Sequence, residues 1–511
     1  MSWTRAALVA LGLAFAANGW RDIVAALVSP LGLQDDAYYY LMIARNLAET
    51  GKSTFDGVNL TNGYHPLWLW IETLFMALGG VGLDTTGQVV AITALEYAVL
   101  GGGLLAVAVT AARERRAGVA AALLLGTALL LYPPHLRIFA AGMESTLVLP
   151  LGAGFLFDLW EGRPRWAGVF AALLVLARLD TMVYVVLPAV ALSCRRPRDI
   201  AWALGPPTVA LCLYTLGNTL AFGHPTPISG MSKSSFPWPH VQLDQITSVP
   251  LSGRTLRSLN QLTVIAVLVA GPLLVRGRGA LGERGRTIVR WLAVLGVLQL
   301  VSFVCFQRWA KPLEQWYLAP VVGIGAAIVA AVVVDRLGAR WALRGATAFA
   351  LLLAVLVGAG LGERAPEQQK QTVVDVLAST PPTAVFASTD SGILAFGSGR
   401  RVINLDGLVN SFAYQDAIRD QHLGAWLRDQ GARFLIVRIW ETAPHFDEPM
   451  YRSRIDSEVF WGHYNTYDFW VHSYVHDADS EKISLGHRRE RWRGPMVMSE
   501  GVRSRFVIFV L

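Results

Sequence analysis

Long apolar blocks separated by short polar loops fill residues 1–362 of this chain. Most of the blocks approach the roughly 20 residues that a helix needs to cross the hydrocarbon core of a bilayer. The sequence therefore predicts a polytopic α-helical membrane protein with about 11 spans. The predicted spans are residues 6–28, 88–111, 117–133, 143–160, 166–178, 181–194, 200–222, 259–275, 289–306, 316–335 and 341–361.

The pattern changes after residue 362, where short β-rich runs alternate with Gly, Pro and Asp turns. Such runs are typical of β-strands, while residues 363–379 and 412–430 have helical spacing. We divide the chain into a membrane domain, residues 1–362, and a C-terminal α/β domain, residues 363–511, expected on the extracytoplasmic side. The predicted strands are residues 383–388, 401–405, 434–439, 468–475 and 505–511.

Composition agrees with a multi-pass protein of the cell membrane. Only 16% of the 511 residues are charged and 53% are hydrophobic, whereas a soluble protein is nearer a quarter charged. The formal net charge of +7 comes from Arg clusters in short loops between apolar blocks, which the positive-inside rule assigns to the cytoplasm. We therefore expect a cytoplasmic N-terminus, membrane lipids as neighbours and no nucleic-acid partner. The 3 cysteines are too widely spaced to indicate a metal site or a disulfide framework.

Two adjacent carboxylates, Asp35 and Asp36, follow the first apolar block and open the first external loop, residues 30–66 or to 87. Charged pairs at a membrane boundary are costly to keep without a role, and carboxylates can accept a proton from a hydroxyl or bind a cation. Residues 37–50 have the spacing of an amphipathic helix, and Gly51 would end it. Asp36 could also be only the N-cap of this helix, with Asp35 a solvated neighbour. One cap does not explain two carboxylates.

Polar and aromatic residues continue along the same loop. Asn62 and Gly63 favour a turn, and Tyr64 and His65 precede Pro66 in an extended conformation. Aromatic faces beside polar donors suit a sugar ring, although aromatic residues also gather at membrane interfaces. The apolar stretch 66–80 is short for a span and is predicted to be an interfacial or re-entrant helix.

The loop motifs carry a family resemblance. Asp-Asp-Ala-Tyr-Tyr-Tyr at 35–40, a helix ending in Ala-Glu-Thr-Gly, and Asn-Gly-Tyr-His-Pro-Leu-Trp at 62–68 resemble the first external loop of GT-C superfamily glycosyltransferases. The membrane helices, the long first loop and the external C-terminal domain are similar too. The nearest resemblance is to bacterial polyprenyl-phosphate-sugar-dependent enzymes, including mannosyl- and arabinofuranosyltransferase-like members.

The resemblance implies an inverting hexosyl- or pentosyltransferase of the cell envelope, acting in cell wall glycan assembly. It would move a sugar from a polyprenyl-phosphate donor to a hydroxyl of a glycan, lipid or protein acceptor. An acidic residue of the first loop would be the general base; we favour Asp35 and keep Asp36 as the alternative. Asp36 is also the candidate ligand for a divalent cation, Mg²⁺ or Mn²⁺, and no other cofactor is expected. His65 stands where some family members have a lysine, which leaves that phosphate contact open.

Lys233 is our first choice for the donor phosphate, because it ends a Pro-rich loop, residues 224–233, that resembles a Lys-bearing external loop of this superfamily. The other donor candidates are His65, Arg178 and Tyr317, and the acceptor or sugar candidates are Tyr39, Asn62, Tyr64 and Glu144.

Structural roles compete with several of these assignments. Glu144 could serve only the dipole of a helix N-terminus. Arg178 and Asp180 could form a structural ion pair, and Tyr317 could belong to the interface belt. In the C-terminal domain, residues 390–392 and 404–407 are typical of turns, and we assign that domain to acceptor recognition or support.

The rival interpretation is a secondary transporter or flippase of a lipid-linked or small polar substrate. Glu96, Asp180 and Gln299 lie within apolar segments and could line a pathway. The chain shows no internal repeat that would divide the spans into halves, as many transporters do. A large external domain is also unexplained by transport.

Overall fold

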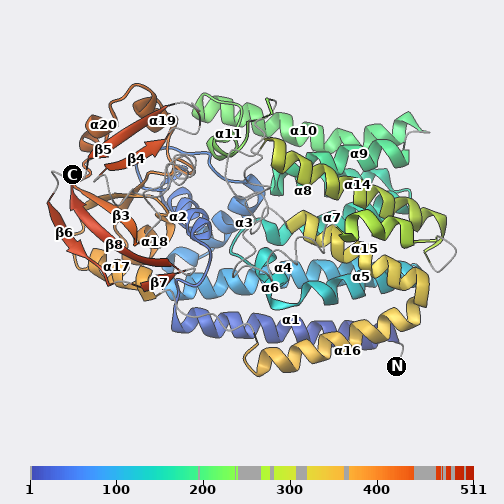
Figure 1. The fold of residues 1–511 in the computed structure, drawn as a ribbon. Helices are drawn as coiled ribbons and strands as arrows, with labels where there is room; N and C mark the ends of the chain where they lie inside the picture. Colours follow the sequence, from blue (N-terminus) through green and yellow to red (C-terminus); the bar gives the residue numbers. More distant parts are fainter. Residues whose placement is uncertain are drawn as a thin grey trace.

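A helical bundle and a C-terminal sheet domain make up the computed structural model, and helix α2 lies between them (Figure 1). The structure describes residues 3–193, 196–235, 238–239, 266–276, 281–306, 319–361, 368–441, 468–472, 475, 479–484, 489–495, 497–499 and 502–511. The bundle contains α1 (Trp3–Val28), α4 (Thr85–Arg113), α5 (Ala117–Leu130), α6 (Pro133–Phe139), α7 (Ser145–Trp160), α8 (Pro164–Ala177), α9 (Met182–Ser193), α10 (Pro197–Phe222), α14 (Gly282–Phe306), α15 (Ala319–Leu337) and α16 (Ala339–Gly358).

Six of the described helices are long and apolar enough to cross a membrane: α1, α4, α10, α14, α15 and α16. The number rises to seven if α5 and α6, which meet at a bend of 99°, count as one span. Every predicted span that is fully described coincides with a helix, but α7, α8 and α9 have only 16, 14 and 12 residues. Of the predicted span 259–275, only residues 266–274 are described as helix. The count of 11 spans is therefore not confirmed.

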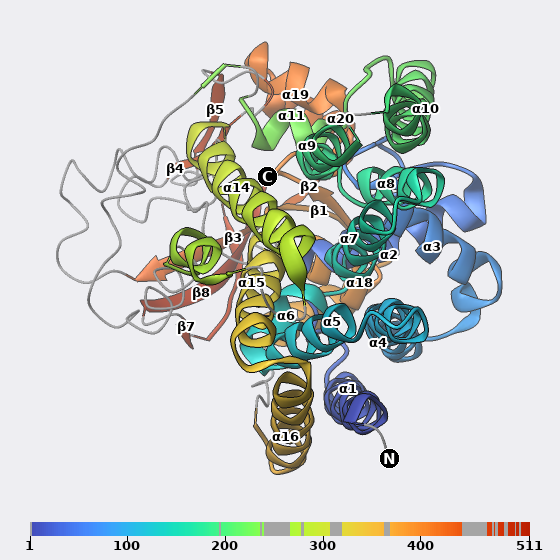
Figure 2. The same cartoon turned by 90° about the vertical axis from the view of Figure 1, so that its right-hand side faces the viewer.

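The helices run roughly parallel along the bundle, and the N-terminus lies at the end farthest from the sheet domain (Figure 1). Viewed down the bundle, α1 and α16 lie side by side at one edge and α10 at the other (Figure 2). Many large apolar side chains on these three helices are exposed, for example Leu220 at 79% and Val355 at 69%. Exposed apolar surface of this kind suits contact with lipid.

The first loop forms two helices, as predicted. Helix α2 (Asp35–Thr50) ends at Gly51, whose φ of 70° is the left-handed conformation that favours glycine. Its N-cap is Gln34 rather than Asp36, and both carboxylates lie in the first helical turn, where they favour the helix dipole. The N-cap alternative for Asp36 is thus wrong. Helix α3 (Pro66–Ala77) is the short apolar helix, with Pro66 in its first turn.

The C-terminal domain is built on a six-stranded sheet of order β2-β1-β3-β8-β6, with β7 pairing β8. Strands β1, β2 and β3 are parallel, and β8 runs antiparallel to β3, β6 and β7. Strands β4 and β5 form a separate antiparallel pair. The strands are β1 (Val385–Ser388), β2 (Arg401–Asn404), β3 (Phe434–Glu441), β4 (Asp468–His472), β5 (Ser480–Ser484), β6 (Glu490–Arg493), β7 (Val497–Ser499) and β8 (Val502–Val510).

The helices of this domain are α17 (Gln368–Ala378), α18 (Gly392–Ser398), α19 (Phe412–Arg419) and α20 (Leu423–Asp429). The five predicted strands are confirmed as β1, β2, β3, β4 and β8. The single helix predicted at 412–430 is wrong, because the chain breaks at Gln421, whose φ of 57° cannot continue a helix. Strands β5, β6 and β7 and the short helix α18 were not predicted.

One apolar core joins α2 to the sheet domain. Tyr38 of α2 packs against Phe396 of α18 with ring centroids 5.1 Å apart, and both side chains are buried. The segments after β1 and β2, at the carboxyl ends of two parallel strands, face α2 through the contacts described below. Functional residues commonly lie at that edge of a parallel sheet.

Candidate active site

A polar cavity of about 210 Å³ lies where α2 meets the start of α7, the α8–α9 junction, α11 (Ile228–Lys233), α14 and the C-terminal domain. Seven of the ten predicted site residues line it, although they come from five separate stretches of sequence. Asp35 and Asn62 lie outside the lining, and Tyr317 falls outside the described residues. The seven residues are Asp36, Tyr39, Tyr64, His65, Glu144, Arg178 and Lys233.

Asp36 and Lys233 face each other in this cavity. The Nζ of Lys233 lies 3.7 Å from Oδ2 of Asp36, and the two side chains are 20% and 23% exposed respectively. Burial raises the pKa of the Asp36 carboxyl above its ordinary value, and the Lys233 ammonium partly offsets this. A partly desolvated carboxylate with a raised pKa is a stronger base than one in water. The pair thus combines a candidate base with a candidate cation.

Asp35 faces the other way, into the C-terminal domain. Its Oδ2 accepts a hydrogen bond from the N–H of Gly392 and its Oδ1 from the N–H of Ile393, each at 3.0 Å. Lys370 Nζ lies 3.8 Å from Oδ1. These two N–H groups begin α18, so Asp35 acts as the cap of a helix more than 350 residues away in sequence. This geometry does not favour Asp35 as the base.

Glu144 and Arg178 form a buried network that also lines the cavity. The hydroxyl of Tyr40 donates to Oε2 of Glu144 at 2.9 Å, while Arg178 Nη1 lies 3.4 Å and His65 Nε2 3.8 Å from its Oε1. Arg178 also binds Asp180 through two hydrogen bonds, at 3.1 and 2.8 Å. The ion pair considered as the structural alternative for Arg178 and Asp180 is therefore present, and both residues line the cavity. Burial lowers the pKa of His65, so its neutral form is favoured.

Tyr39 connects the cavity wall to the C-terminal domain. Its hydroxyl donates to Oδ2 of Asp406 at 2.7 Å and accepts from Ser391 N and Asn404 Nδ2 at 3.2 and 3.1 Å. Asp406 is 2% exposed, and burial raises its pKa to about 6. The segments 390–392 and 404–407, which sequence alone explained as turns, thus bind α2. The only hint of these contacts in the sequence was the presence of Asp and Asn at the ends of two predicted strands.

Asn62 holds the loop that carries Lys233. Its Nδ2 donates to Thr226 O at 3.2 Å, and its Oδ1 accepts from Ile228 N at 2.9 Å. Both ends of the amide are engaged and the side chain is fully buried. Asn62 therefore holds the loop at Thr226 and Ile228, and its predicted contact with a sugar stays a prediction. Tyr64 remains at the cavity, with its hydroxyl 2.9 Å from Ser53 Oγ.

The C-terminal domain supplies part of the wall directly. Leu408 and Val409 line the cavity, and Gly63 of the first loop lies so close that an added Cβ would be 1.7 Å from Leu408 O. His224 stacks on Phe412 with ring centroids 3.8 Å apart. The segment after β2 thus forms part of the cavity wall, and α19 packs against His224, just before α11. No sequence pattern indicated these contacts.

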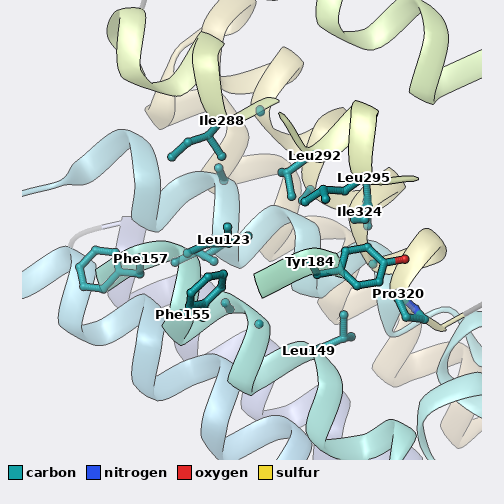
Figure 3. Close-up of a pocket in the computed structure, with 18 of the residues that line it drawn as sticks. Leu123, Leu149, Phe155, Phe157, Tyr184, Ile288, Leu292, Leu295, Pro320 and Ile324 are labelled. Atoms are coloured by element: carbon teal, nitrogen blue, oxygen red, sulfur yellow. The ribbon is translucent and has the colours of Figure 1, made fainter. Parts of the chain in front are cut away.

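A second, apolar cavity of about 230 Å³ lies within the bundle (Figure 3). Leu149, Phe155, Tyr184 and Ile324 are among the side chains around it in the figure. Helix α14 connects the two cavities: Leu292 and Leu295 line the apolar one, and Gln299 and Ser302, further along the same helix, line the polar one. Helix α7 does the same, from Glu144 just before its start to Leu149 and beyond. The apolar cavity therefore neighbours the polar one along shared helices.

The described residues do not fit a divalent-metal site at Asp36. Within the described ranges, no group of three or more His, Cys, Asp or Glu side chains is placed to hold a metal ion. Asp36 faces the Lys233 ammonium, and Glu144 faces the Arg178 guanidinium. Both carboxylates therefore already have cationic neighbours.

Comparisons with known proteins give distant similarities. A family profile described as a domain of unknown function, DUF8728, matches residues 362–483, and no curated protein matches the chain. Among solved structures, the archaeal oligosaccharyltransferase AglB from Archaeoglobus fulgidus in complex with an inhibitory peptide and a dolichol-phosphate is similar, with a TM-score of 0.45 and 13% identity. That match covers 85% of this chain and 69% of the other.

The Archaeoglobus fulgidus oligosaccharyltransferase in complex with Zn and sulfate gives a TM-score of 0.41 at 13% identity. The alignment covers 79% of this chain but only 64% of the other, so the chain spans under two thirds of its length. At these scores and identities the likeness carries no argument about function.

Proposed function

We propose that this chain is a glycosyltransferase that moves a sugar from a polyprenyl-phosphate donor to an acceptor hydroxyl on the extracytoplasmic face of the membrane. The supporting observation is the pairing of Asp36 and Lys233, 3.7 Å apart, in a polar cavity beside an apolar one. A base and a cation at the head of an apolar cavity match a donor with a phosphate head and a prenyl tail.

Asp36 is the general base in this proposal. As the acceptor oxygen attacks the anomeric carbon, its proton passes to the Asp36 carboxylate, and the bond between that carbon and the phosphate oxygen breaks. The leaving phosphate keeps the electron pair. Attack from the face opposite the leaving group inverts the anomeric centre. Asp36 is favoured over Asp35 because only Asp36 lines the cavity.

Lys233 is the group that stabilises the leaving phosphate. An ammonium next to a developing negative charge in a partly desolvated site lowers the barrier more than it would in water. The prenyl tail would occupy the apolar cavity lined by α7, α14 and α15. His65 and Arg178 would also lie near the donor, and Arg178 is already held by Glu144 and Asp180. We therefore give Arg178 an orienting role.

The acceptor would approach from the side of the C-terminal domain. Tyr39 and Tyr64 offer aromatic surface to a sugar, and Glu144 offers a hydrogen-bond acceptor beside Tyr40. Leu408 and Val409 close that side, which agrees with a role for the domain in acceptor recognition. The proposed topology has a cytoplasmic N-terminus, as the positive-inside rule favours, and an extracytoplasmic sheet domain at the opposite end of the bundle (Figure 1).

Reconstituted vesicles can test the proposal. Purified protein is given radiolabelled hexoses and pentoses on undecaprenyl phosphate, with a cell-envelope glycan extract as acceptor, and transferred label is counted. We expect wild-type transfer, and a loss of about a hundredfold or more in Asp36→Asn, as for removal of a general base. Lys233→Gln should lose activity. Lys52→Gln, which removes the same charge at an exposed position of the first loop, should not.

Two results would contradict the proposal. Full activity of Asp36→Asn would remove the proposed base. Movement of the labelled lipid across the bilayer without transfer to any acceptor would favour the flippase alternative.

A further inference from the structure

Glu96 is a buried carboxylate within the membrane helix α4, and the proposed chemistry does not use it. Its side chain is fully buried, in a helix long and apolar enough to span a bilayer. A carboxylate at such a position is costly and usually has a function. Its Oε1 accepts hydrogen bonds from Gly142 N at 2.6 Å and Met143 N at 3.2 Å. Glu96 therefore holds the backbone directly before Glu144.

Gly142 is fixed from three sides. Its N–H binds Glu96, and its carbonyl oxygen accepts from Trp68 Nε1 at 3.3 Å. Its φ of 81° requires glycine. An added Cβ would lie 2.5 Å from the Cβ of Ala37 and 3.1 Å from Leu33 Cδ1. Gly142 thus packs tightly against the first turn of α2, with no room to move closer.

The residues next to this contact line the proposed catalytic cavity. Ala37 directly follows Asp36, and Glu144 is two residues after Gly142. Tyr40, one turn further along α2, binds Glu144. A shift of Gly142 would therefore change the separation between Asp36 and Glu144.

We propose that Glu96 is a positioning residue that sets the spacing of Asp36 and Glu144 through the Gly142–Met143 backbone. This inference rests on the proposed glycosyltransferase function. It replaces the pathway role that Glu96 would have in a transporter.

The experiment compares Glu96→Ala with Glu96→Gln in the vesicle transfer assay. Displacement of catalytic groups by about 1 Å can cost about a hundredfold in rate, so Glu96→Ala should lose between about tenfold and about a hundredfold. Glu96→Gln keeps an oxygen for Gly142 N and should restore most of the rate. Thr93→Val is the matched control. Thr93 is buried one turn earlier on α4, and its hydroxyl has no hydrogen-bond partner among the described residues.

Binding of undecaprenyl phosphate, measured as a rise in melting temperature, separates positioning from misfolding. Lys233 lies on α11, which does not carry the Gly142–Met143 backbone, so Glu96→Ala should keep the wild-type rise while losing transfer. If Glu96→Ala does not fold, Glu96→Asp tests the inference instead. Its side chain is shorter and cannot reach Gly142 N, so Glu96→Asp should lower transfer, whereas Glu96→Gln should not.

Full transfer by folded Glu96→Ala or by Glu96→Asp overturns the inference. Equal losses in Glu96→Ala and Glu96→Gln also overturn it, because charge and not the backbone contact would then matter. If the wild type itself transfers nothing, the proposed function fails instead.

Discussion

Gly63→Ala tests whether the C-terminal domain forms a wall of the working site. Gly63 does not have a positive φ, so alanine is allowed by the local backbone. Its Cβ, however, would lie 1.7 Å from Leu408 O, 2.8 Å from Leu408 C and 3.2 Å from Val409 Cα. These are backbone atoms, so no side-chain rotation relieves the clash.

The size of the effect follows from these distances. Contacts of a real Cβ closer than 3.0 Å essentially do not occur, so the two segments must separate by about 1.3 Å. Forced overpacking of this kind costs about 1–3 kcal/mol of stability. Leu408 and Val409 line the cavity, and a displacement of about 1 Å can lower a catalytic rate about a hundredfold. We therefore expect a loss of transfer together with a lower melting temperature.

The assay is transfer in vesicles, with thermal unfolding in detergent measured on the same preparation. Gly82→Ala is the control, because Gly82 has no atom within 4 Å of an added Cβ and no positive φ. Wild-type rate and melting temperature in Gly63→Ala would refute the reasoning, since the segment after β2 could not then lie against the first loop.

Three further predictions concern the contacts around α2. Asp35→Ala removes the two oxygens that accept from N–H groups of α18 and also removes the Lys370 contact. Unfolding measurements should therefore show a loss of about 1–3 kcal/mol of stability; an unchanged melting temperature would exclude this cap. The pKa of Asp406 is raised to about 6, so the folded protein favours the protonated carboxyl. This contribution to stability is fully present below about pH 4 and is lost as pH rises through about 6. That contribution is about 3 kcal/mol, and a melting-temperature difference between wild type and Asp406→Asn that does not change with pH would contradict it. Asn62→Ala frees the loop of Lys233, so the KM for the lipid-phosphate donor should rise about fivefold to tenfold; an unchanged KM would contradict this.

Local pattern was sufficient for most helices, and most of the residues that it singled out for the site line the polar cavity. Apolar runs predicted the bundle helices because burial in lipid or protein selects the same residues, and Gly51 marked the end of α2. Seven of the ten predicted site residues line one cavity, since polar residues at helix ends beside apolar blocks have few other roles. The family resemblance contributed Lys233, which no spacing rule would have selected.

The sequence could not distinguish Asp35 from Asp36. Their difference depends on Gly392, more than 350 residues away, and on Lys233. For the same reason Leu408 was not predicted to line the cavity, and the hydrogen bonds of Asn62 to the loop of Lys233 were not predicted. Long-range contacts between a loop and a separate domain leave no periodic trace in sequence.

The most direct test is a cryo-EM map of the protein in a lipid nanodisc with a non-hydrolysable analogue of an undecaprenyl-phosphate sugar. We expect the phosphate within hydrogen-bond distance of Lys233, the anomeric carbon facing Asp36 and the tail between α7, α14 and α15. An analogue bound elsewhere, with Asp36 out of reach of the sugar, would contradict the proposed catalytic site.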